Sequence, residues 1–124
     1  MKIVITAILL LITAPVHLQR AVFYAPVKTV RFPKTNEGEK LNYRFTIKNT
    51  GDIPLTIYGF EAECTCTDVK LPAMPIQPNE SEFIEVSFDT RGKYFYQDRV
   101  IYFATNTKRK REKLRFKVFV IPKD

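Results

Sequence analysis

The chain has 124 residues but no tryptophan, one histidine, two serines and four glycines, and these shortages exclude several kinds of site. The histidine, His17, lies near the N-terminus, so the body of the chain has no imidazole for a Ser-His-Asp or Cys-His arrangement. Neither Ser81 nor Ser87 lies in a Gly-x-Ser-x-Gly elbow, and the glycines are too scattered for a phosphate loop. We therefore expect neither an enzyme active site nor a cofactor.

The first twenty residues are typical of a secretory signal peptide. Lys2 precedes an uncharged run from Ile3 to Val16, and small residues follow. The run is shorter than the roughly 20 apolar residues of a membrane span. We predict a signal helix over residues 1–20 and export to the periplasm or the cell exterior. Because no ideal cleavage site follows, an uncleaved anchor is the alternative, and membrane contact would then involve this segment alone.

The remainder of the chain shows the period-two alternation of β-strands and no helical period. In residues 41–48 the apolar Leu41, Tyr43 and Phe45 alternate with polar residues, as in a sheet with one buried face. Seven such segments separated by turn residues predict an all-β, immunoglobulin-like antiparallel sandwich of two sheets over residues 29–121, with 21–28 as a lead-in. The expected strands are 29–32, 41–48, 55–60, 66–71, 82–89, 98–105 and 113–121.

Glycine and asparagine mark the turns between these strands. Gly51, in the stretch Asn49-Thr-Gly-Asp, can take a positive φ at low cost, and Gly92 is expected to form a turn after the 82–89 strand. Pro54 cannot donate a hydrogen bond to a central ladder, so the chain reverses before residue 55.

Six short elements, taken in order, resemble a family of bacterial exported domains of unknown function over about residues 29–120. The fold of that family is similar to the major-sperm-protein and pilus-chaperone branch of immunoglobulin-like sandwiches. The sequence departs from the family pattern at Thr65 and Asn79, where glycine is usual. The matching elements are Asn49-Thr50-Gly51-Asp52, Leu55-Thr56-Ile57, Cys64-Thr65-Cys66-Thr67, Pro78-Asn79-Glu80, Val86-Ser87-Phe88-Asp89-Thr90 and Asn106.

Cys64 and Cys66 are the only cysteines, and they lie two residues apart. In an extended strand their Cα atoms would be about 6.5–7 Å apart, whereas a disulfide favours about 5.5–6 Å, so a direct bond requires a bend. Three interpretations are open: a structural pair with no chemistry, a thiol–disulfide redox site, or a soft copper(I) site that also uses Met74.

A cluster of basic residues lies between the last two expected strands. Residues 108–111 are expected to form a hairpin tip, and the strand that follows extends the positive charge along the outer face of the sheet. The excess charge is moderate, because removal of residues 1–20 lowers the formal charge from +7 to +5. An ordinary solvated loop is one interpretation of this cluster, and a contact with an anionic envelope polymer is the other. The candidate surface for that polymer consists of Lys108, Arg109, Lys110, Arg111, Arg115 and Lys117.

Three consecutive aromatic residues, Tyr94, Phe95 and Tyr96, follow Gly92. We expect them to cap the end of the sandwich, with exposure to a partner as the alternative. Overall the sequence predicts a non-catalytic binding or structural module that contacts a protein or an envelope polymer, and no nucleic acid. Strand addition at a sheet edge is one mode of contact. The alternative is a thiol–disulfide or copper-handling protein that uses Cys64 and Cys66.

Overall fold

The computed structural model describes residues 3–4, 7–11 and 19–124, and every strand lies between residues 23 and 121. No helix occurs in this part of the chain, so none of its segments is a helical membrane span. The strands are β1 (Phe23–Tyr24), β2 (Thr29–Arg31), β3 (Thr35–Asn36), β4 (Lys40–Asn49), β5 (Ile57–Ala62), β6 (Thr67–Lys70), β7 (Ser81–Asp89), β8 (Phe95–Thr105) and β9 (Arg111–Ile121).

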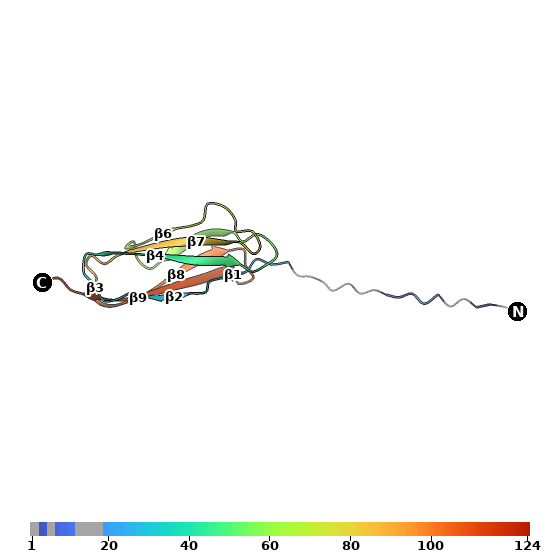
Figure 1. Ribbon diagram of the computed structural model, residues 1–124, viewed down its shortest axis with the longest axis horizontal. Helices are drawn as coiled ribbons and strands as arrows, with labels where there is room; N and C mark the ends of the chain where they lie inside the picture. The colour runs from blue at the N-terminus through green and yellow to red at the C-terminus, as the bar shows by residue number, and fades with distance from the viewer. Residues whose placement is uncertain (1–2, 5–6, 12–18) are drawn as a thin grey trace.

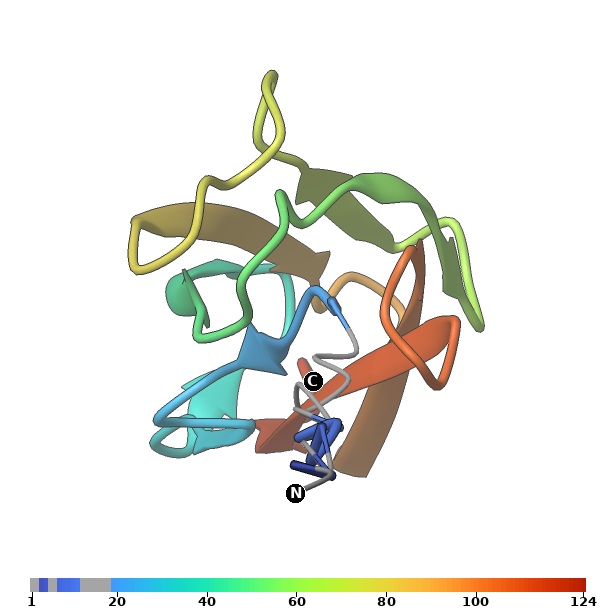
Figure 2. The ribbon, with the colours of Figure 1, turned by 90° about the vertical axis from the view of Figure 1, so that its right-hand side faces the viewer.

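The strands form two sheets that face each other (Figure 1). The first sheet has the order β1-β4-β7-β6, and the second has the order β2-β9-β8-β5, with β3 also paired to β9. The β6–β7 connection, residues 71–80, projects away from the sheets (Figure 2). This is the expected all-β sandwich of two sheets.

The N-terminal strand of the sandwich is divided between the two sheets. β1 pairs antiparallel with the end of β4, and β2 then pairs parallel with β9. Residues 25–28 therefore cross from the first sheet to the second. Residues 21–28, expected to be a lead-in, supply β1 and three buried side chains, Ala21, Phe23 and Ala25.

The core lies between the sheets and consists of the apolar residues that alternate along the long strands. Leu114, Phe116 and Val118 of β9 point inward, and Ile84 and Phe88 do so from β7. Contacts between aromatic rings connect the sheets, because the ring centroids of Phe88 and Phe116 are 5.0 Å apart. The largest fully buried side chains are Phe45, Phe88, Phe103, Phe116, Ile47, Leu55, Ile76, Ile84, Ile101, Leu114, Val120 and Asn49.

Several details of the predicted fold differ from the structure. The sandwich was expected to be antiparallel, but β2 and β3 both pair parallel with β9, because the N-terminal chain crosses between the sheets before it reaches β9. The described chain has nine strands where about seven were expected, because β1 and β3 have two residues each, too few to show alternation. Most of the predicted signal helix lies outside the described residues, and 3–4 and 7–11 are not helical. Gly51 does not take a positive φ, whereas Gly92 does, with φ of 73°. A side chain on Gly51 would instead overlap the carbonyl oxygen of Arg20.

Candidate functional site

The outer face of the second sheet carries a ladder of cations, called the basic face below. Arg111, Lys113, Arg115 and Lys117 point outward from β9, whereas Leu114 and Phe116 of the same strand point into the core. Successive side chains on such a ladder are about 7 Å apart. Arg31 of β2 pairs with Lys117 and extends the ladder to the neighbouring strand.

The β8–β9 connection adds the cations at the end of this ladder. Lys108 and Arg109 are exposed there, and Lys110 takes a positive φ of 61° that closes the turn. The amide of Lys110 donates to the carbonyl oxygen of Thr107, and its carbonyl oxygen accepts from the amide of Thr105. All six cations predicted from the sequence therefore lie on this connection or on the outward side of β9.

Two acidic residues neutralise part of the basic face. Asp98 accepts two hydrogen bonds from the Arg115 guanidinium, at 2.7 and 2.9 Å, and these bonds lower the pKa of Asp98. Glu61 lies 3.6 Å from Arg111, whose guanidinium stacks 3.8 Å from the ring centroid of Tyr102. Within the described chain, no carboxylate is in ion-pair contact with a lysine of this face, so the lysines supply most of the uncompensated charge.

A hollow of about 440 Å³ adjoins the cations at the β5 side of the same sheet. Gly59 and Ala104 are cross-strand partners, and the hollow stays open because Gly59 has no side chain and Ala104 has only a methyl group. A Cβ added to Gly59 would meet no atom within 4 Å. The exposed ring of Tyr58 and the side chains of Lys110 and Arg111 also line the hollow. The sequence did not predict this hollow, since its residues come from three separate segments.

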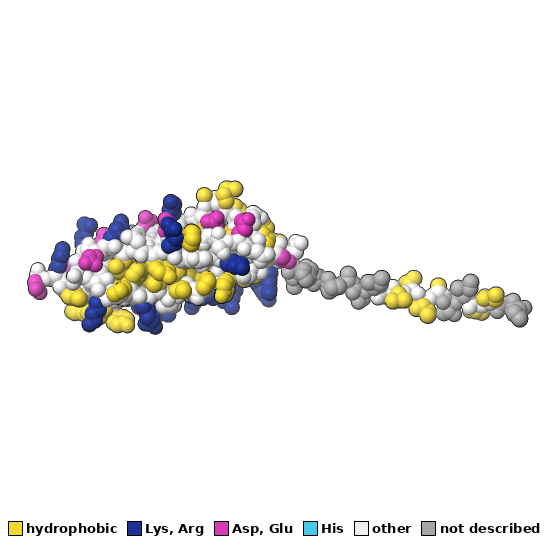
Figure 3. Space-filling model, in the orientation of Figure 1, with side chains coloured by type: hydrophobic (Ala, Val, Ile, Leu, Met, Phe, Trp, Pro, Cys, Tyr) yellow, Lys and Arg dark blue, Asp and Glu magenta, His cyan; other side chains and the backbone are white. Residues whose placement is uncertain are grey.

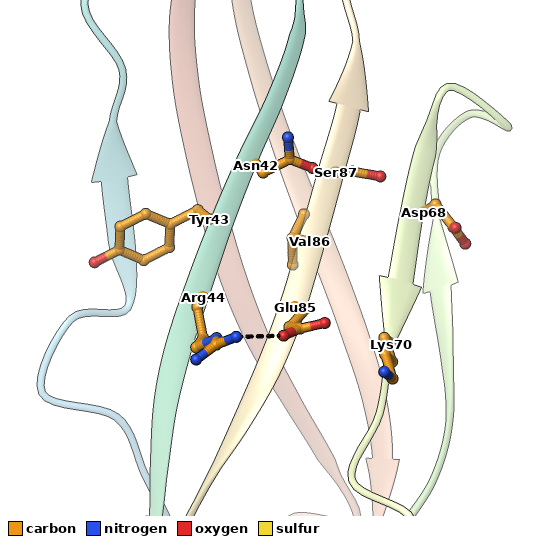
Figure 4. Close-up of a pocket in the computed structure, with 8 residues that line it drawn as sticks. All are labelled: Asn42, Tyr43, Arg44, Asp68, Lys70, Glu85, Val86 and Ser87. Atoms are coloured by element: carbon orange, nitrogen blue, oxygen red, sulfur yellow. Dashed lines mark hydrogen bonds and ion pairs between the residues drawn. The ribbon is translucent and has the colours of Figure 1, made fainter.

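The outer face of the first sheet has a hollow of about 510 Å³ with a balanced charge. Figure 4 shows Arg44 and Glu85 joined by an ion pair, at 2.8 Å, across β4 and β7. Asp68 and Lys70 of β6 border the other side. This hollow is lined by two cations and two anions, and one ion pair has already formed between them. It therefore lacks the excess positive charge of the basic face.

Cys64 and Cys66 lie in the β5–β6 connection, where the chain crosses from the second sheet to the first. A disulfide joins them, with the Cα atoms 5.2 Å apart, so the chain is bent at this point. Both residues are half-buried against the core, and the carbonyl oxygen of Cys66 accepts a hydrogen bond from the amide of Asp89.

The structure does not bring Met74 to the cysteines. Met74 lies in the β6–β7 connection and is 75% exposed. Ile76 of the same connection pairs with Leu55, which precedes β5. The cysteines follow the other end of β5, a strand of six residues that spans about 20 Å. The described residues also contain no group of three His, Cys, Asp or Glu side chains arranged to hold a metal ion.

The aromatic residues after Gly92 are exposed rather than packed over the sandwich end. Tyr94, Phe95 and Tyr96 have exposed fractions of 52%, 59% and 68%. The expected capping role is therefore wrong, because the first residues of β8, beginning at Phe95, lie outside the buried part of the sandwich. Phe95 and Tyr96 both contact the ring of Phe119, with centroids 6.1 and 6.2 Å apart.

The Asn49-Thr-Gly-Asp turn holds the fold together instead of forming a site. The fully buried Asn49 side chain donates to the carbonyl oxygens of Ile53 and Ile76, at 2.7 and 2.9 Å. Its oxygen accepts from the amides of Gly51 and Val22, at 2.9 and 3.2 Å. Four backbone groups from three segments are satisfied by one side chain.

Three other residues from the matching elements have similar roles. The Asp52 carboxylate accepts from the amide of Arg20 at 2.7 Å, which secures the start of the described domain. The Thr90 hydroxyl donates to the carbonyl oxygen of Glu39 at 2.6 Å. Asn106 accepts from the amide of Thr56 and donates to the carbonyl oxygen of Pro54, both at 2.9 Å. These side chains hold backbone segments together through their hydrogen bonds.

A family model described as "Protein of unknown function (DUF1573)" matches residues 24–120. No curated protein matches the chain in sequence.

Solved structures with similar folds include a protein of unknown function from Porphyromonas gingivalis W83 (TM-score 0.72, 15% identity). The match covers 82% of this chain and 47% of that one, so the chain spans about half of that protein. The seventh PapD-like domain of human CEP192 matches with a TM-score of 0.57 and 12% identity, over 90% and 92% of the two chains. WR4, a C. elegans MSP family member, matches with 0.53 and 10%, over 79% and 96%. These similarities establish the PapD-like and MSP-like fold.

Proposed function

The chain belongs to the family described as protein of unknown function DUF1573, and we propose that it is an exported, non-catalytic binding module that holds an anionic polymer on its basic face. The observation that carries this proposal is the row of outward cations on β9, among them Lys113 and Lys117, with Lys108, Arg109 and Lys110 on the connection at its end. Among the described residues, none of these five cations has an ion-pair partner. A surface on which uncompensated cations gather attracts polyanions.

The neighbouring hollow favours a polymer built of rings. The open space above Gly59 and Ala104 has the exposed ring of Tyr58 beside it and the cations of Lys110 and Arg111 at its border. Aromatic side chains bind the apolar faces of planar or cyclic groups, and the adjacent cations neutralise their acidic substituents. An anionic polysaccharide combines both features. The sequence of residues 1–20 and the Cys64–Cys66 disulfide support export, because disulfides persist outside the cytosol.

The test is the affinity of the full chain for heparin, used as a probe, at several salt concentrations. The double variant Lys108→Glu/Lys113→Glu is expected to bind at least tenfold more weakly, with a smaller dependence on salt, because fewer counterions are released. The matched control is Lys40→Glu/Lys48→Glu, which changes the net charge equally on the first sheet. Equal losses in both variants would show that net charge alone is responsible and would refute the proposed face.

A second candidate function is thiol–disulfide exchange at Cys64 and Cys66, favoured by the disulfide across a two-residue spacing. The variant Cys64→Ser/Cys66→Ser should retain heparin binding if the basic face is the site. Reduction of a small disulfide substrate by the reduced chain, lost in this variant, would support the second candidate. The mass of the purified chain with and without reductant, together with its copper content, distinguishes a stable structural disulfide from a redox or copper site.

A further inference from the structure

In the described part of the chain, β4 of the first sheet has one edge that is mostly without a neighbouring strand. β4 pairs with β7 along its whole length, but on its other side β1 pairs only with Lys48 and Asn49. Within the described residues, no strand pairs with that side of β4 from Lys40 to Ile47, because the N-terminal chain has crossed to β9. Figure 1 looks onto this side of the sandwich, where β4 and β2 border the space between the two sheets.

The backbone groups on this edge belong to alternate residues of β4. The amide of Asn49 donates to Glu80 and the carbonyl oxygen of Glu39 accepts from Thr90, so odd-numbered residues direct their hydrogen bonds toward β7. In an antiparallel pair the intervening residues direct theirs to the opposite side. The amides and carbonyl oxygens of Asn42, Arg44 and Thr46 are therefore directed to the open edge. An exposed edge of this kind is a template for another strand.

An apolar seam lies beside the edge, between the two sheets. Tyr43 of β4 contacts the ring of Phe32, which follows β2, with centroids 6.2 Å apart. Val30 and Leu41, also half-buried, adjoin the same region of the core. Figure 4 shows Tyr43 pointing toward β2, and Figure 3 shows an apolar band along this side of the molecule with lysine and arginine atoms above and below.

The charges on β4 determine which strand fits. Lys40, Arg44 and Lys48 project outward at regular spacing, and of the three only Arg44 has an ion-pair partner among the described residues, Glu85. If two copies paired antiparallel through β4 about Arg44, Lys40 would oppose Lys48 and Arg44 would oppose itself. Like charges directly opposite each other destabilise a pair of strands. This register of two copies is therefore disfavoured, whereas an acidic strand would meet opposite charges at Lys40 and Lys48.

We propose that β4 accepts an extended segment of a partner protein as an added strand. The segment has apolar residues at alternate positions, which cover the seam beside Tyr43 and Phe32, and acidic residues between them, which face Lys40, Arg44 and Lys48. Backbone hydrogen bonds to Asn42, Arg44 and Thr46 supply affinity, and the alternating side chains supply specificity. This surface lies on the first sheet and is separate from the basic face.

The test uses a ten-residue peptide of alternating glutamate and valine, which has the length of β4. Titration into the isotopically labelled full chain should shift the amide resonances of Asn42, Arg44 and Thr46. A peptide of the same composition with its valines in one block should bind at least tenfold more weakly. Shifts confined to β9 and the β8–β9 connection, or self-association through β4 without peptide, would overturn the proposal.

Two further comparisons separate strand addition from simple charge attraction. The variant Lys40→Glu/Lys48→Glu should lose about tenfold in peptide affinity, whereas Lys108→Glu/Lys113→Glu should keep it, the reverse of their effects on heparin. The two variants therefore distinguish failure of the proposed strand addition from failure of the proposed heparin binding. Methylation of the glutamate amides and of the valine amides should have unequal effects, since only one set faces β4. Equal effects of the two methylated peptides would refute backbone pairing.

Discussion

Replacing Asn49 by alanine removes four hydrogen bonds at once and leaves their backbone partners inside the protein. The partners are the amides of Val22 and Gly51 and the carbonyl oxygens of Ile53 and Ile76. At about 1 kcal/mol for each bond, the free energy of unfolding should fall by about 4 kcal/mol. This is a large part of the roughly 5–15 kcal/mol that stabilises a domain, and it corresponds to a decrease in Tm of about 20 °C.

Urea denaturation followed by circular dichroism measures this loss. The control is Asn42→Ala, because Asn42 is exposed on the outer face of β4, where a substitution should change the free energy of unfolding by less than about 0.5 kcal/mol. A loss below about 1 kcal/mol for Asn49→Ala, similar to that of the control, would refute the view that this asparagine joins three segments of the fold.

Three other predictions concern stability. Gly51→Ala should destabilise the domain by about 2 kcal/mol in the same urea assay, because the added Cβ overlaps the backbone of Arg20. Gly59→Ala should leave the stability unchanged or raise it by up to about 1 kcal/mol, because the added Cβ meets no atom. Equal effects of the two substitutions would contradict the packing described. Hydrogen bonds from Arg115 lower the pKa of Asp98, so the contribution of Asp98 to stability is complete above its unfolded-state pKa of about 3.8 and is lost as the pH falls through the lowered folded-state pKa. Thermal unfolding at acidic pH should therefore show a smaller decrease in Tm for Asp98→Asn than for the parent chain, and identical pH profiles would exclude the effect. Reduction of the Cys64–Cys66 disulfide should lower the free energy of unfolding by no more than about 1.5 kcal/mol, because the closed loop is so short, and global unfolding on reduction would contradict this.

Most of the fold is predictable from the alternation of apolar and polar residues along the strands. Residues such as Ile84, Phe88, Leu114 and Phe116 point inward as their spacing predicts, because a half-buried sheet forces apolar residues onto one face. The division of the first strand was not predictable in this way. Two residues in β1 and three in β2 are too few for a period, and their pairing with different sheets depends on contacts distant in sequence.

The candidate surfaces were predictable to different degrees. The outward position of Arg115 and Lys117 follows from the alternation of β9. Arg111 was expected at the hairpin tip but begins this strand, and Lys113, which was not among the predicted cations, also points outward. The hollow at Gly59 and the open edge of β4 depend on which strands become neighbours, and composition carries no information about that. Tyr94, Phe95 and Tyr96 are exposed although aromatic side chains favour burial, because they lie beyond the buried part of β8.

The most direct test of the proposed function is a residue-by-residue titration of the isotopically labelled chain with a heparin fragment, followed by amide chemical shifts. We expect the changes to lie on the outward residues of β9, on Lys108–Lys110 and around Gly59, and to disappear as salt is raised. Changes centred on Cys64 and Cys66 or on the hollow between Arg44 and Lys70, or no changes at all, would contradict the assignment of the basic face as the binding surface.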